Sequence, residues 1–206
     1  MGERSYGGRT ASERATERRA RLVRATATVL AERGTTRTTM TAVCAEAGLT
    51  ERYFYESFRN LDEALVATLD DIADRILGLV TAEVARTPGT AGERVQAAAR
   101  ALVELVVAEP AAVRVAVVHA AGASALRERR DALVGGFAQA IAAEAAALYG
   151  QQAWPTARAL ARARVLVAGL ADLVGAWTEG HSDLDAEDLV EVAADLFEQV
   201  LRRPRG

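Results

Sequence analysis

Residues 38–66 read TTMTAVCAEAGLTERYFYESFRNLDEALV, and this stretch decides the fold. Thr38 or Thr39 can cap a short helix, and Gly48 follows that helix as a turn residue. Thr50 is placed to cap a second short helix directly after the turn. Two short helices joined by a tight turn that contains glycine form the helix-turn-helix pattern.

The rest of the chain also predicts helices. Half of the 206 residues are apolar but only 5% are aromatic, and long segments are rich in Ala, Leu, Glu and Arg. Apolar periodicity, Gly and Pro place helices at about 13–33, 38–47, 51–57, 60 into the 80s, 92–108, a short one from 110, 124–149, 155–179 and 185–202. The fold class expected from this pattern is all-α.

Four of the ten aromatic residues fall within six positions of the second short helix and its end. A helix turns about 100° per residue, so Phe54 and Phe58 share one face and predict core anchors. Tyr53 and Tyr55 then lie on the two flanks, and Arg52 lies opposite the core face. The aromatic residues therefore divide into a core pair and a pair beside an outward-facing arginine.

The order of these signals resembles the DNA-binding domain of TetR-family transcriptional regulators, over about residues 20–66. The resemblance implies an N-terminal three-helix helix-turn-helix domain and a larger C-terminal helical domain for ligand binding and dimerisation. The expected divisions are a flexible arm at 1–12, a DNA-binding domain at 13–59, and an effector-binding and dimerisation domain at 60–206.

The helix geometry suggests how the second short helix would meet DNA. Arg52 would lie deepest in a major groove and read a base, most plausibly guanine O6 and N7. The alternative is that Arg52 and Glu56 form only an exposed ion pair. Tyr53 and Tyr55 would contact phosphates or thymine methyl groups.

One departure from the family pattern affects these contacts. Family members often carry Lys near the start of the fourth helix, where this chain has Leu61, and Arg59 or Asn60 can supply the missing phosphate contact. A second departure is Cys44, at a place where Ala is usual. The predicted DNA-binding residues are Thr39, Thr50, Glu51, Arg52, Tyr53, Tyr55, Arg59 and Asn60.

Charge is divided unevenly along the chain. Residues 1–60 hold 11 Arg and 7 acidic residues, a balance of +4, whereas residues 61–206 hold 14 Arg and 21 acidic residues, a balance of −7. A basic first third on an otherwise acidic protein indicates that this part meets a polyanion, here double-stranded DNA.

The larger C-terminal part predicts a homodimer and a small-molecule site. The resemblance implies that the last two helices pair with a second subunit, through Leu166, Leu170, Leu173, Leu189, Leu196 and Val200. Polar or aromatic residues among aliphatic neighbours are the candidates for binding a mostly apolar effector: Arg100, His119, Gln139 and Trp177. The alternatives are an interior or helix-end role for His119 and a core or interface role for Trp177.

Other functional classes find little support in the sequence. With two His, one Cys and no phosphate-loop, metal-spacing or nucleophile-elbow motif, we expect no catalysis, metal or cofactor. The single Cys, the polar N-terminus and the absence of about 18 consecutive apolar residues predict a cytoplasmic protein without membrane contact. All 25 basic residues are Arg, which indicates a GC-rich bacterial genome. The expected function is a ligand-released repressor of a near-palindromic operator. The alternatives are a regulator without a ligand, or an activator.

Overall fold

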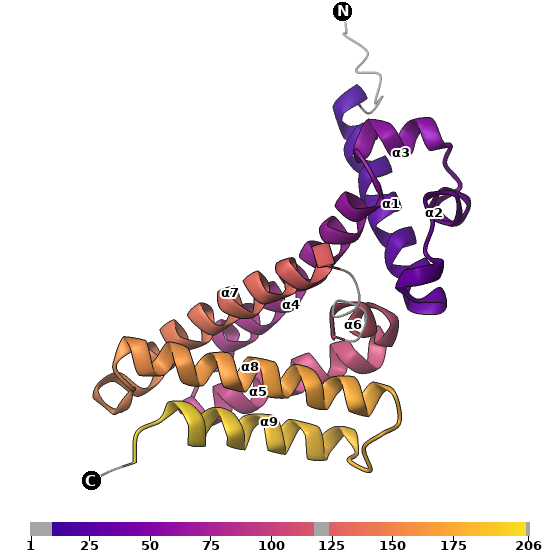
Figure 1. The fold of residues 1–206 in the computed structure, drawn as a ribbon. Coiled ribbons are helices and arrows are strands. Elements are labelled where there is room, and N and C mark those ends of the chain that lie inside the picture. The colour runs from indigo at the N-terminus through magenta and orange to yellow at the C-terminus, as the bar shows by residue number, and fades with distance from the viewer. Residues whose placement is uncertain (1–9, 118–123, 205–206) are drawn as a thin grey trace, which may run out of the picture.

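The computed structural model describes residues 10–117 and 124–204, and every regular element within these ranges is helical. Figure 1 shows a small N-terminal group of helices joined to a larger bundle by one long helix. The α-helices are α1 (Ala11–Arg33), α2 (Met40–Ala47), α3 (Glu51–Ser57), α4 (Leu61–Arg86), α5 (Ala91–Ala108), α6 (Pro110–Val117), α7 (Ser124–Tyr149), α8 (Thr156–Thr178) and α9 (Ala186–Leu201). The all-α prediction is confirmed.

The first helix begins slightly earlier than its apolar pattern predicts. Thr10 and Glu13 form a capping box, in which the Thr10 hydroxyl accepts from the Glu13 amide and the Glu13 carboxylate accepts from the Thr10 amide. The helix therefore starts at Ala11, inside the range 1–12 that was expected to be an arm. Residues 1–9 of that range lie outside the described residues.

Helices α1, α2 and α3 pack around one small core with the start of α4. The core is aliphatic on the α1 and α2 side and aromatic on the α3 side. Its buried members are Leu22, Val23, Ala25, Val29, Val43, Cys44, Ala47, Phe54, Phe58 and Ala64. This packing fixes the angle between the two short helices, because the buried side chains of both helices pack against the same residues of α1.

The turn between α2 and α3 depends on Gly48. Its φ of 59° and ψ of 38° are left-handed, and its amide donates to the Ala45 carbonyl at 3.1 Å. The next amide, that of Leu49, donates to the Cys44 carbonyl at 3.0 Å. Two of the last carbonyls of α2 are thereby satisfied, and residues 48–50 alone connect α2 to α3.

We expect Gly48→Ala to destabilise the protein by about 1–2 kcal/mol, because a Cβ is unfavourable in the left-handed region. Chemical denaturation followed by circular dichroism measures the change. Gly78→Ala is the matched control, since Gly78 lies inside α4 and a Cβ at this position would have no neighbour within 4 Å. That substitution should stabilise the protein by about 0.5–1 kcal/mol. Equal effects of the two changes would contradict the role given to the turn.

Helix α4 belongs to both parts of the molecule. Near its start Ala64 packs in the small core, whereas the next residue, Leu65, and Leu69 one turn further on pack with Leu30 of α1 and Val115 of α6. Its C-terminal half runs along the larger bundle beside α7, as Figure 1 shows. Helices α8 and α9 lie side by side on the outside of this bundle.

Helix α7 contains a long apolar stretch. The stretch Leu126–Gln152 is long and apolar enough to cross a membrane by length and composition alone. In the structure, however, this helix packs against α4 and α8. Small side chains such as Ala138, Ala142 and Ala145 lie in its contact with α8, which lets the two helices approach closely.

Candidate nucleic-acid interface and effector cavity

Helix α3 is held to its domain by the two phenylalanines that the sequence predicts as anchors. Phe54 is 0% exposed and Phe58 is 2% exposed, and their ring centroids lie 5.6 Å apart. The Arg19 guanidinium of α1 lies over the Phe58 ring, 4.5 Å from its centroid. The prediction that these two rings form the core face is confirmed.

The opposite face of α3 carries exposed polar side chains. The Arg52 side chain is 84% exposed, and its Nε donates to the Glu56 carboxylate at 3.0 Å. Tyr55 is 60% exposed, and its ring meets the Phe54 ring edge-on. In the free chain, therefore, Arg52 forms the ion pair with Glu56 and still stands at the surface.

A contact from α1 to α3 was missed by the sequence reasoning. The Arg18 guanidinium lies over the Tyr53 ring, 4.7 Å from its centroid, and its Nη2 is 3.7 Å from the Glu56 carboxylate. Tyr53 is consequently only 36% exposed. The two flanks of α3 are unequal: Tyr55 is free, whereas Tyr53 is partly occupied by α1. Helix periodicity within α3 could not reveal a partner on another helix.

The capping residues differ in what their side chains do. The Thr39 hydroxyl caps α2 by accepting from the Ala42 amide at 3.2 Å. Thr50 occupies the N-cap position of α3, but its hydroxyl makes no capping hydrogen bond, contrary to the expected cap. Glu51, which follows it, accepts at 3.5 Å from the Thr41 hydroxyl of α2. The Thr50 hydroxyl therefore remains available to another acceptor or donor.

Arg59 and Asn60, which could supply the phosphate contact of the missing lysine, both form hydrogen bonds with Glu63 in the first turn of α4. Asn60 caps this helix through its Oδ1, which accepts from the Glu63 amide at 2.9 Å. Arg59 donates to the Glu63 carboxylate from its amide at 2.8 Å and from its Nε at 3.1 Å. These bonds lower the pKa of the Glu63 carboxyl. Because the Arg59 side chain is 89% exposed, it is the better placed of the two to meet a phosphate.

Cys44 lies in the core of the small domain, where it packs as a small apolar side chain. Burial raises the pKa of its thiol, and the nearby Glu51 carboxylate adds to this effect. The thiol therefore stays protonated and unreactive at neutral pH.

The larger bundle contains a partly open apolar cavity of about 290 Å³, which is lined by residues of all six helices from α4 to α9. Its wall is almost wholly aliphatic, with Phe137 and Phe197 as aromatic members. Lining residues come from α4 (Ile76, Leu77, Val80), α5 (Ala98, Leu102), α6 (Val113, Ala116), α7 (Leu133, Ile141) and α8 (Val167, Leu170, Val174), among others. A cavity of this volume and lining suits a small apolar molecule.

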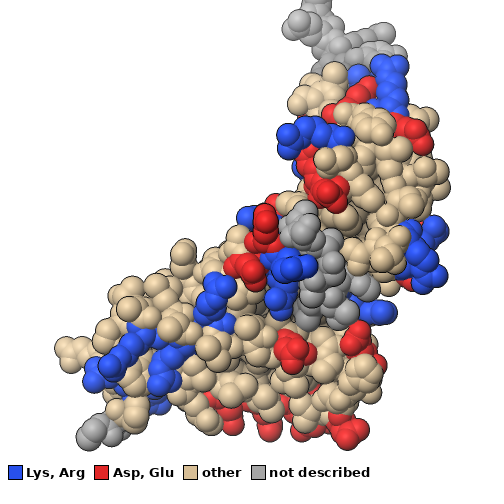
Figure 2. All heavy atoms as spheres, in the orientation of Figure 1, with Lys and Arg blue, Asp and Glu red and all other residues tan. Residues whose placement is uncertain are grey.

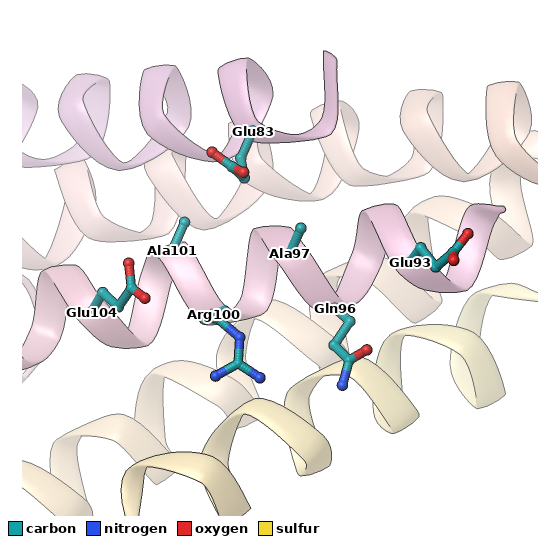
Figure 3. A pocket seen from close by; sticks show the side chains of 7 residues that line it. All are labelled: Glu83, Glu93, Gln96, Ala97, Arg100, Ala101 and Glu104. Atoms are coloured by element: carbon teal, nitrogen blue, oxygen red, sulfur yellow. The ribbon is translucent and has the colours of Figure 1, made fainter. Parts of the chain in front are cut away.

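None of the three described effector candidates lines this cavity. Arg100 forms a two-pronged ion pair with Glu187 of α9, at 2.6 and 2.7 Å. It borders a polar depression along α5, shown in Figure 3 with Gln96 and Glu104. Gln139 is exposed on α7. Trp177 packs between helices and donates from its Nε1 to the Leu184 carbonyl at 2.8 Å. His119 lies outside the described residues.

Periodicity along α5 and α7 places Arg100 and Gln139 on outer faces, so a polar residue among apolar neighbours in the sequence does not by itself mark the cavity. The cavity residues are the inward aliphatic ones, which look like ordinary core in the sequence.

The six residues expected at a dimer interface differ widely in exposure. Leu166 and Leu189 are each 3% exposed and belong to the subunit's own core, so they are unavailable to a partner. Leu170, Leu173 and Val200 are half-buried, and Leu196 is exposed. The outer face of α8 instead presents Val165, which is 72% exposed, with the small exposed residues Ala168 and Gly169.

The surface charge follows the division seen in the sequence. Figure 2 shows basic and acidic side chains together on the small domain, and acidic ones gathered along the lower edge of the larger domain. Basic side chains also gather at the far end of the bundle. Arg162 and Arg203 lie over the Trp154 ring, 4.1 and 5.9 Å from its centroid. Within the described ranges, no group of three or more His, Cys, Asp or Glu residues could hold a metal ion.

Comparison with known proteins places these features in a family. Residues 22–68 match the family model of bacterial regulatory proteins of the tetR family. This match covers α2, α3 and most of α1, together with the start of α4. No curated protein sequence matches the chain.

Solved structures share the whole fold at low sequence identity. A TetR family transcription regulator from Marinobacter aquaeolei is 15% identical with a TM-score of 0.65, covering 94% of this chain and 100% of its own. The fatty acid degradation regulator FadR from Bacillus halodurans is 14% identical with a TM-score of 0.72, covering 87% and 94%. FadR from Bacillus subtilis, solved with stearoyl-CoA, is 16% identical with a TM-score of 0.70, covering 88% and 97%. The N-terminal domain therefore belongs to the tetR family of bacterial regulatory proteins, and the chain as a whole shares the fold of solved TetR-family regulators.

Proposed function

We propose that this regulator is a cytoplasmic repressor, not an enzyme, that binds a near-palindromic operator as a homodimer and is released by a small apolar effector. Residues 13–59 would bind DNA, with 1–12 as an accessory arm, and residues 60–206 would bind the effector and form the dimer. Thr39, Thr50, Glu51, Arg52, Tyr53, Tyr55, Arg59 and Asn60 remain the proposed DNA-contacting set.

The observation that carries this proposal is the continuity of α4. Its first half packs into the small domain through Ala64 and Leu65, and its second half supplies Ile76 and Val80 to the cavity wall. Helix α6 makes a similar link, because Val115 packs against α1 while Val113 lines the cavity. A change in cavity shape would thus be transmitted to both α4 and α6, on which the small domain rests.

This coupling can release DNA only if the effector binds the helix arrangement that does not fit the operator more tightly than the arrangement that does. A ligand that separates the walls of the cavity would tilt α4 and change the spacing of the two α3 helices in a dimer. In a two-fold dimer these helices must lie about 34–36 Å apart to reach successive major grooves. FadR from Bacillus subtilis was solved with stearoyl-CoA, whose acyl group is a long hydrocarbon chain, and this supports an effector with an apolar part here.

We expect Arg52→Ala to lower affinity for the operator by about 1–3 kcal/mol and to relax the base preference at one position. Tyr55→Phe keeps the ring that packs on Phe54 but removes the exposed hydroxyl, so it should weaken binding to all sequences alike. Fluorescence anisotropy with operator and random duplexes measures both effects. Equal losses on both duplexes for Arg52→Ala would show that Arg52 reads no base.

Selection of bound sequences from a random DNA pool tests the function as a whole. A repressor of this kind should select a near-palindrome, and addition of small apolar molecules should then release the duplex. A palindrome without release by any ligand would support a regulator that acts without an effector. Placement of the selected site relative to a promoter, with a reporter, distinguishes repression from activation.

A further inference from the structure

The apolar cavity carries two charged side chains on one helix. Arg130 and Glu144 both line it from α7, and apart from Thr81 on α4 the remaining lining residues have apolar side chains. They are fourteen positions apart, which is about 21 Å along a helix axis. The wall is therefore positively charged toward the N-terminal end of α7 and negatively charged toward its C-terminal end.

Arg130 has no acidic partner in the described part of the chain, in contrast to comparable arginines. Its neighbour Arg129 pairs with Asp70 of α4, and Arg75 pairs with Glu109 at the end of α5. Residues 118–123, which precede α7, read VHAAGA and so include no carboxylate. Within the described residues, half-buried Arg130 is thus a positive charge on this wall without a counter-ion.

A charge beside an apolar surface is stabilised when an opposite charge and hydrogen bonds accompany it. The planar guanidinium offers paired N–H donors that match a carboxylate in a two-pronged arrangement. Glu144 would repel the same group, so the two charges together give a bound molecule one direction. The aliphatic wall between them, including Leu133, Phe137 and Ile141, would accommodate a hydrocarbon chain.

The Arg130 end of the cavity is also the end that contacts the DNA-binding domain. Leu126 and Leu133, one turn to either side of Arg130 on α7, pack in the same cluster as Leu30 of α1 and Leu65 of α4. A group bound at Arg130 would therefore lie beside the packing that joins the two domains.

We propose that the effector is an elongated amphiphile whose carboxylate head binds Arg130 and whose hydrocarbon tail lies along α7 toward Leu148. This inference rests on the proposed effector-released repressor, because it names the chemical class of that effector. It assigns recognition to the head group and leaves the aliphatic wall to supply affinity for the tail.

The test uses the full chain with hexadecanoate, hexadecanol and the coenzyme A thioester of hexadecanoic acid, each titrated by calorimetry below the concentration at which it aggregates or separates from water. The wild type should bind hexadecanoate more tightly than hexadecanol. Arg130→Gln should weaken hexadecanoate binding about 10- to 100-fold and leave hexadecanol binding unchanged. Arg127→Gln is the matched control, because Arg127 is exposed on the same helix and does not line the cavity.

Circular dichroism should first show that each variant melts like the wild type. Equal weakening of the acid and the alcohol by Arg130→Gln, or binding of the thioester alone, would overturn the carboxylate assignment. Absence of binding by all three molecules would overturn it as well. Release of the operator is followed in the same samples. If hexadecanol releases DNA as well as the acid does, the repressor function stands and the head-group assignment fails. If none of these three molecules and no other small apolar molecule releases the operator, the proposed function itself fails.

Discussion

Replacement of Phe54 by Ala should unfold the DNA-binding domain and abolish operator binding. Phe54 is fully buried in a core of small aliphatic residues, so its truncation would leave a large cavity. Phe→Ala changes at such sites cost about 3–5 kcal/mol, which is a large share of the about 5–15 kcal/mol that stabilises a typical domain. Loss of helical signal at low denaturant concentration, measured by circular dichroism, would record the change.

Tyr55→Ala is the matched control for this experiment. Tyr55 is adjacent on the same helix and 60% exposed, so its truncation should change stability by no more than about 0.5 kcal/mol. Both variants should bind DNA poorly, but only Phe54→Ala should do so because the domain is unfolded. A cooperative, wild-type-like unfolding transition in Phe54→Ala would contradict the anchoring role of this ring.

The helix-turn-helix was accessible from the sequence because its signals are local. Gly48 at a left-handed turn, Thr39 at a cap, and Phe54 and Phe58 one turn apart each act through neighbours in the chain. Helix bounds elsewhere were also predicted closely, since Pro110, Gly150 and the polar loop before α9 punctuate the pattern. The start of α1 was missed because the Thr10–Glu13 capping box precedes any apolar residue.

The effector cavity was not accessible in the same way, because its lining is defined by packing between distant helices. Aliphatic residues such as Val80 and Leu102 are indistinguishable in sequence from those that fill a core. Arg130 lies in the run RERRD, where four charged neighbours conceal which side chain turns inward. Only the three-dimensional arrangement shows that Arg129 turns to Asp70 while Arg130 borders the cavity.

The outer face of α8 leads to the second large expected effect, which is dissociation of the proposed dimer by Val165→Glu. Val165 is 72% exposed beside Ala168 and Gly169, and a Cβ at Gly169 would have no neighbour within 4 Å. Leu196 on the adjacent α9 is also exposed, which gives the pair of helices an outward surface with apolar members. We propose that this surface of one subunit packs against the same surface of a second subunit. The four helices would then form the interface, and the small residues of α8 would lie where two helices approach each other.

A two-fold interface contains each residue twice, so Val165→Glu would bury two unpaired carboxylates at once. Breaking or omitting the partner of a buried charge costs about 3–5 kcal/mol, so the dimer dissociation constant should rise at least about 100-fold. Light scattering should then give a monomer at micromolar concentration, and affinity for a palindromic operator should fall because one subunit reads only one half-site. Val107→Glu serves as the control, since Val107 is 57% exposed on α5 and receives the same new charge. A dimer that survives Val165→Glu, or one lost equally in Val107→Glu, would exclude this face of α8 as the interface.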